Sequence, residues 1–148
     1  MAGSRKTPLS PTHFVIDSSI VAAWYFDDES DAYADAVAVS LPKTVAVVPS
    51  IFHLEIANIL IIGERRKRST EAKAAAFLSR VSVLPFIVDG QTPSRAWSDT
   101  IALARAQGLT SYDAAYLELA LRESLPLASL DRDLKAAAKA LGVPVFTP

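Results

Sequence analysis

Short β-branched runs alternate with longer helical stretches along the chain, and this alternation limits the fold more than any other feature. The strand-like runs are "HFVID" (13–17), "TVAVVP" (44–49), "LPFIV" (84–88) and "PLAS" (126–129). Strands that alternate with helices form βαβ units and pair into a parallel sheet. Strands that are apolar almost throughout are expected where helices cover both faces of that sheet. We therefore predict an α/β fold, with a central parallel sheet between two layers of helices.

Composition excludes several classes of protein and of site. The 148 residues include no cysteine, which excludes disulfides, zinc–thiolate sites and cysteine nucleophiles. The net charge of −1 means that any binding of nucleic acid must come from a local basic patch. The longest apolar run, "EIANILII" (55–62), is far shorter than the ~20 residues that cross a bilayer. We expect a soluble, cytoplasmic protein with no membrane contact, made of a flexible N-terminal tail (1–12) and a single domain (13–148).

Acidic residues follow the predicted strands. Asp17 ends the first strand, Asp131 follows the fourth, and Glu55 lies on the helix after the second, with Asn58 one turn further along as an accessory polar group. Ligands of parallel α/β sheets bind outside the carboxyl ends of the strands. Asp113 begins the helix before the fourth strand, but a whole helix precedes it, so the pattern leaves its position open.

Carboxylates gathered at one edge need compensation. Two of them ~4 Å apart repel by about 4 kcal/mol at an effective dielectric constant of about 20. Mg²⁺ or Mn²⁺ compensates this repulsion, because both ions prefer oxygen ligands, and such an ion can activate water and neutralise a phosphodiester. Each acid also has a purely structural explanation. Asp17 and Asp131 could cap helices, while Asp113 and Asp133 could favour helix N-termini electrostatically.

Four stretches in order, "FVIDSSIVAAWYF", "PSIFHLEIANIL", "LTSYDAAYLELAL" and "LASLDRDL", resemble the PIN domain, in particular VapC-type toxin ribonucleases. The resemblance implies a PIN-like three-layer α/β/α sandwich and an endoribonuclease site that uses Mg²⁺ or Mn²⁺. The acids that match the family quartet, as catalytic residues and metal ligands, are Asp17, Glu55, Asp113 and Asp131. Asp133 matches a more variable metal position, and Ser19 and Ser129 match small polar residues beside the site. The resemblance further implies an RNA substrate such as transfer RNA, a small antitoxin of the VapB type, and a homodimer.

Two other features concern partners. "GERRKRS" (63–69) supplies a basic patch, which could bind RNA phosphates or form a solvated turn: Arg65, Arg66, Lys67 and Arg68. "SIFHLEIANILII" (50–62) is apolar around most of a helix, and Trp24, Tyr25 and Phe26 are crowded at the end of another. Each of these apolar groups is either buried in the core or covered by a partner chain such as an antitoxin.

Other functions remain open at this level. A housekeeping RNA-processing nuclease would use the same site, and a non-catalytic scaffold for RNA or protein would use none of it. A phospho-acceptor signalling domain would need paired acids after the first strand and a lysine after the last. Here Ser18 and Ser19 follow Asp17, and "VPVFTP" (143–148) contains no lysine, so this class fits poorly.

Overall fold

A computed structural model describes residues 12–148, and it contains the predicted parallel sheet. The strands are β1 (Thr12–Ile16), β2 (Thr44–Pro49), β3 (Phe86–Asp89) and β4 (Leu127–Ala128). They lie in the order β3-β2-β1-β4, and every pairing is parallel. Because β1 lies between β2 and β4, the strands that the acids follow are neighbours in the sheet.

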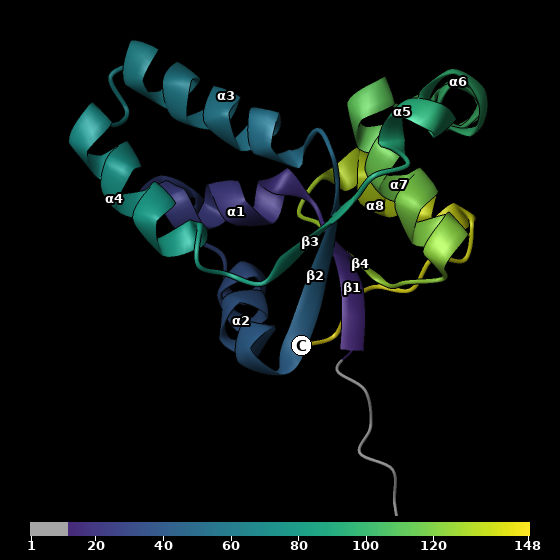
Figure 1. Ribbon diagram of the computed structural model, residues 1–148, viewed down its shortest axis with the longest axis horizontal. Helices are drawn as coiled ribbons and strands as arrows, with labels where there is room; N and C mark the ends of the chain where they lie inside the picture. Colours follow the sequence, from purple (N-terminus) through teal and green to yellow (C-terminus); the bar gives the residue numbers. More distant parts are fainter. Residues whose placement is uncertain (1–11) are drawn as a thin grey trace, which may run out of the picture.

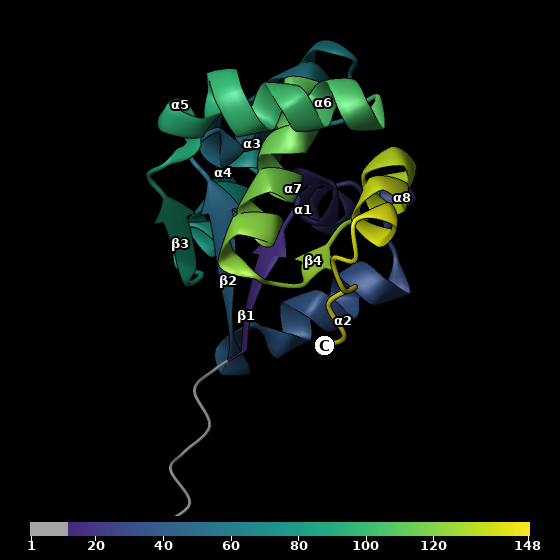
Figure 2. The ribbon, with the colours of Figure 1, turned by 90° about the vertical axis from the view of Figure 1, so that its right-hand side faces the viewer.

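Helices cover both faces of this sheet, as Figures 1 and 2 show. One layer holds α1 (Ser18–Tyr25), α2 (Ala32–Ser40), α3 (Phe52–Arg65) and α4 (Glu71–Val81). The other holds α5 (Thr92–Arg95), the π-helical segment η3 (Ala96–Thr100), α6 (Ile101–Gln107), α7 (Ser111–Glu123) and α8 (Arg132–Ala140). Short 3₁₀ turns, η1 (Asp27–Glu29) and η2 (Leu41–Lys43), flank α2. The predicted three-layer α/β/α sandwich is confirmed.

The centre of the sheet and helix α7 form the middle of the hydrophobic core. Phe14, Val15 and Ile16 of β1 are completely buried, as expected for a strand covered on both faces. Residues 114–120 of α7 are all buried, and this helix packs against β1 and β2. Asp113 therefore lies in the first turn of a deeply buried helix, and that helix packs against the central strand β1.

The ends of several elements are well defined. Helix α3 begins at Phe52 with Ile51 in the cap position. The π-helical segment lies between α5 and α6, and α6 is followed by Gly108 in the left-handed conformation (φ 64°). Thr12 belongs to β1, and the rest of the predicted tail lies outside the described residues. In the described part of the chain, no helix is long and apolar enough to span a membrane.

Candidate active site

Three acids stand at the carboxyl ends of three adjacent strands. Asp17 directly follows β1 in the N-cap position of α1, Glu55 is in the first turn of α3 after β2, and Asp131 follows β4 at the N-cap of α8. The first turns of α1 and α3 lie at the same end of the sheet in Figure 1. Sheet order therefore gathers residues that are far apart in sequence.

Asp113, whose position the sequence left open, joins this group. It lies in the first turn of α7, where Thr110 accepts its backbone N–H at 3.2 Å. Burial, followed by the charges of Asp17 and Asp131, raises the pKa of Asp113 to about 6. Such electrostatic coupling requires short separations, so α7 begins at the edge of the sheet where the other acids lie.

Two serines hold the carboxylate of Asp17. Asp17 is 2% exposed, and its Oδ2 accepts hydrogen bonds from Ser19 Oγ at 2.6 Å and from Ser129 Oγ at 2.8 Å. Burial raises the pKa of Asp17, the two hydroxyls lower it, and the charge of Asp131 raises it again. Although Asp17 occupies an N-cap position, its side chain caps no helix N–H. Its carboxylate therefore takes part in the site and not in helix capping, and neither serine donates a hydrogen bond to the other oxygen, Oδ1.

The same serines fix the loop that carries Asp131. Ser19 Oγ accepts the backbone N–H of Leu130 at 2.9 Å, and Ser129 Oγ accepts that of Asp131 at 3.0 Å. Asp131 Oδ1 accepts the N–H of Leu134 at 2.8 Å and so caps α8. The structural explanation of Asp131 is therefore correct, and it still leaves the second oxygen of the carboxylate for another partner.

Glu55 is held by Tyr116, which the sequence analysis did not single out. Tyr116 is fully buried, and its hydroxyl donates to Glu55 Oε1 at 2.5 Å. Burial raises the pKa of Glu55, the tyrosine lowers it, and the charges of Asp17 and Asp113 raise it. Tyr116 is three residues after Asp113, a spacing that places both on one side of a helix. That spacing is the one sequence signal for Tyr116, and by itself it does not distinguish this residue from a core aromatic residue.

The two remaining predicted polar residues, Asp133 and Asn58, are exposed. Asp133 is exposed in the first turn of α8 and adds a minor charge effect at Asp113. Asn58 is exposed on α3, one turn beyond Glu55. The accessory roles of both stay predictions.

The fit of a cation can be tested against these side chains. The donor set is all carboxylate and hydroxyl oxygen, which suits Mg²⁺ or Mn²⁺. The raised pKa of Asp113 reflects burial and, after it, the negative charge of its neighbours, and a cation would offset that charge. Within residues 12–148, however, no three acidic or histidine side chains converge closely enough to hold an ion as they stand. Like charges repel, so carboxylates without a cation are expected to turn apart. The donor chemistry fits, and the ligand roles stay predictions.

In the structure, the four cations of the basic patch fall into two groups. Arg65, Arg66 and Lys67 are exposed at the end of α3, and none of them forms an ion pair with another described residue. Arg68 instead donates to Asp28 at 2.9 Å and to Glu29 at 2.8 Å, and its guanidinium lies 4.0 Å from the ring centre of Phe26. Arg68 is thus partly neutralised and mainly joins the α3–α4 turn to the end of α1.

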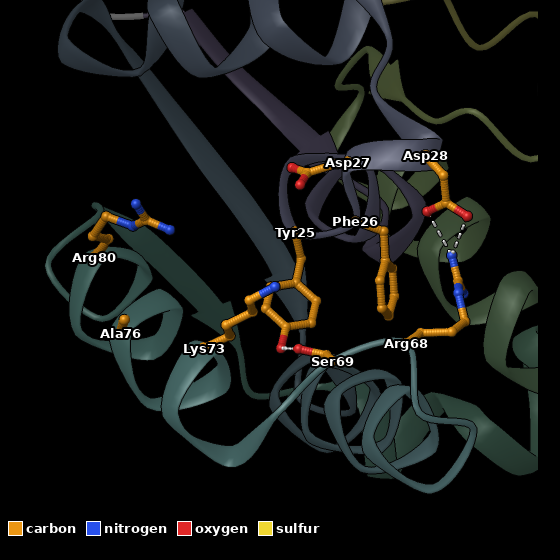
Figure 3. Close-up of a pocket in the computed structure, with 9 residues that line it drawn as sticks. All are labelled: Tyr25, Phe26, Asp27, Asp28, Arg68, Ser69, Lys73, Ala76 and Arg80. Carbon is orange, nitrogen blue, oxygen red and sulfur yellow. Dashed lines mark hydrogen bonds and ion pairs between the residues drawn. The ribbon is translucent and has the colours of Figure 1, made fainter.

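A cavity of about 440 Å³ is lined in part by Arg68 and Asp28, and by none of the four acids of the candidate site (Figure 3). Tyr25, Phe26, Lys73 and Arg80 are among the residues that line it, and the hydroxyl of Tyr25 hydrogen-bonds that of Ser69. Phe26 is buried, and the indole N–H of Trp24 donates to Ala34 O at 2.7 Å. The crowded aromatic residues are therefore largely structural, as the first of the two explanations held.

Comparison with known proteins identifies the fold family. Residues 14–140 match the PIN domain. The chain belongs to the PIN domain family. This PIN domain is 32% identical over 130 residues to Ribonuclease VapC3 of Pyrobaculum aerophilum, covering 88% of this chain and 98% of that one. The VapC resemblance seen in the sequence is thereby confirmed.

Solved structures agree with the fold. PAE2754 from Pyrobaculum aerophilum superposes with a TM-score of 0.63 at 25% identity, over 85% of this PIN domain and 86% of that chain. Mycobacterium tuberculosis VapC20, described as a toxin that cleaves the sarcin-ricin loop, superposes with a TM-score of 0.61 at 19% identity, over 91% and 99% of the two chains. At that identity the second likeness concerns the fold alone.

Proposed function

We propose that this PIN domain is a metal-dependent endoribonuclease and the toxin of a VapBC-type toxin–antitoxin pair. The observation that carries the proposal is the placement of Asp17, Glu55 and Asp131 after three adjacent strands, at one edge of the sheet. Asp113 at the start of α7 adds a fourth carboxylate, whose raised pKa responds to burial and to the charges of Asp17 and Asp131. Packing alone gives no reason to bring these carboxylates together, since each raises the free energy of ionising the others. Similarity to Ribonuclease VapC3 over nearly the whole of both chains supports RNA as the substrate.

The proposed roles follow from the contacts. Asp17, Glu55, Asp113 and Asp131 would hold Mg²⁺ or Mn²⁺, with Asp133 as an accessory. When bound, the ion supplies an activated water and neutralises charge on the phosphodiester. Ser19 and Ser129 orient Asp17 and favour its ionised form. Asp113, with its pKa of about 6, would be drawn to its ionised form by a bound cation.

The proposed partners are an RNA such as transfer RNA, a VapB-type antitoxin and a second copy of the chain. For the homodimer, the supporting observation is on α3, where Leu54 is 75% and Ile61 42% exposed. They are seven positions apart, so they lie on one side of the helix. Light scattering of the wild type and of Leu54→Glu tests this point, and a dimer unaffected by the substitution would reject this surface.

The function is tested by inducing wild type and Asp17→Asn in a bacterium, together with an RNA cleavage assay with and without Mg²⁺. Asp35→Asn, an exposed acid on α2, is the matched control. We expect wild type and Asp35→Asn to arrest growth and to cleave RNA only with Mg²⁺, and Asp17→Asn to do neither. Equal growth and equal cleavage for wild type and Asp17→Asn would reject the enzyme and favour a scaffold.

A further inference from the structure

Tyr116 brings a buried hydroxyl to the site without being one of its acids. It is 0% exposed, and its hydroxyl donates to Glu55 Oε1 at 2.5 Å, across 61 positions of sequence. Tyr116 is on α7 and Glu55 on α3, and Figure 1 shows these helices on opposite sides of the sheet. The hydrogen bond therefore joins the two helical layers at the carboxyl end of the strands.

The hydroxyl can act only as a donor to Glu55. Burial, followed by the charge of Glu55, raises the pKa of Tyr116 far above its ordinary value, so the phenol keeps its proton. The Tyr116–Glu55 hydrogen bond is thus directed from α7 to α3.

We propose that Tyr116 is a positioning residue, whose hydroxyl holds Glu55 in the orientation in which the glutamate binds the divalent cation. The inference rests on the proposed function. Glu55 is only half-buried, and its flexible side chain has several rotamers available. A donor on Oε1 selects among them and leaves Oε2 for the cation. Partners that orient metal ligands in this way are commonly worth ~10–100-fold in metal affinity.

The test is calorimetric titration of Mn²⁺ into wild type, Tyr116→Phe and Tyr33→Phe. Tyr33 is the matched control, because its hydroxyl donates to Phe146 O at 2.6 Å and contacts none of the acids. We expect Tyr116→Phe to bind Mn²⁺ about ten-fold more weakly or worse, and Tyr33→Phe to bind like wild type. In the cleavage assay, Tyr116→Phe should raise the Mg²⁺ concentration for half-maximal rate and leave the KM for RNA unchanged.

The outcomes separate this inference from the proposed function. Mn²⁺ binding by wild type that Tyr116→Phe leaves unchanged overturns the role of Tyr116 alone. Wild type that binds no Mn²⁺ overturns both proposals. If Tyr116→Phe fails to fold by circular dichroism, Glu55→Gln takes its place, since it removes the carboxylate that Tyr116 is proposed to orient. We then expect Mn²⁺ binding weakened about ten-fold or more, and unchanged binding would again overturn the inference.

Discussion

Ser129 donates a hydrogen bond of 2.8 Å to Asp17, although 112 positions of sequence separate the two residues. Because β4 pairs directly with β1, the residue after one strand meets the residue after the other. Ser19 Oγ reaches the same carboxylate oxygen from the neighbouring helix. The central acid of the site is therefore oriented by both the sheet and the first helix.

Removal of these hydroxyls should weaken cleavage and move its pH dependence. Both serines lower the pKa of Asp17, so Ser19→Ala and Ser129→Ala should raise it further. A higher pH is then needed to ionise Asp17, and the acidic limb of the pH–rate profile should move upward, with about ten-fold lower activity at neutral pH for one lost charge-assisted bond. Ser40→Ala is the control, since Ser40 donates to Val37 O on α2. A profile that moves downward in either site variant would contradict this role.

Asp113 should make the metal-free protein less stable as pH rises. Its folded-state pKa is raised from 3.8 to about 6, whereas in the unfolded chain it stays near ~3.9. Between these values the folded protein holds a proton that the unfolded chain has released, so the free energy of unfolding falls as pH rises from about 4 to about 6. Urea unfolding at several pH values should show this slope in wild type and a smaller one in Asp113→Asn.

The control for that series is Asp35→Asn, which should keep the wild-type slope, because Asp35 is exposed on α2. Burial also raises the pKa values of Asp17 and Glu55, so part of the slope should remain in Asp113→Asn. Identical slopes in Asp113→Asn and wild type would show that Asp113 is not coupled to the other acids.

Only part of the basic patch should bind RNA. Three cations at the end of α3 are without an ion pair among the described residues, whereas Arg68 is bound by Asp28 and Glu29. Each phosphate contact to single-stranded nucleic acid contributes ~0.7 to the slope of log affinity against log salt. Substituting glutamine for Arg65, Arg66 and Lys67 together should therefore reduce that slope by about 2.

Arg68→Gln is the comparison for the patch. It should change the salt slope little and should lower thermal stability, because it removes the contacts to η1 and to the Phe26 ring. An unchanged slope in the triple variant would reject the patch as an RNA-binding surface.

The sequence predicted those parts of the site that depend on strand ends. Asp17 and Asp131 could be placed because parallel strands end at one edge, and Glu55 because its helix starts there. Asp113 could not, since α6 separates its helix from the preceding strand, and only tertiary packing of α7 on β1 decides where that helix begins.

Other features needed contacts between distant residues. Tyr116 lies in a run of buried residues on α7, so its pattern resembles that of any core aromatic residue, and its hydroxyl has meaning only beside Glu55. Arg68 forms an ion pair with Asp28, which lies forty positions earlier in the chain, and the charge pattern of the sequence alone does not indicate that pair.

The central claim is that four separated carboxylates surround one divalent cation at this edge of the sheet. Anomalous diffraction from crystals soaked in Mn²⁺ tests it most directly. We predict a manganese peak ligated by Asp17 and by at least two of the acids Glu55, Asp113 and Asp131, and no such peak in crystals of Asp17→Asn. A wild-type map with full Mn²⁺ access to this edge and no peak there would contradict the account.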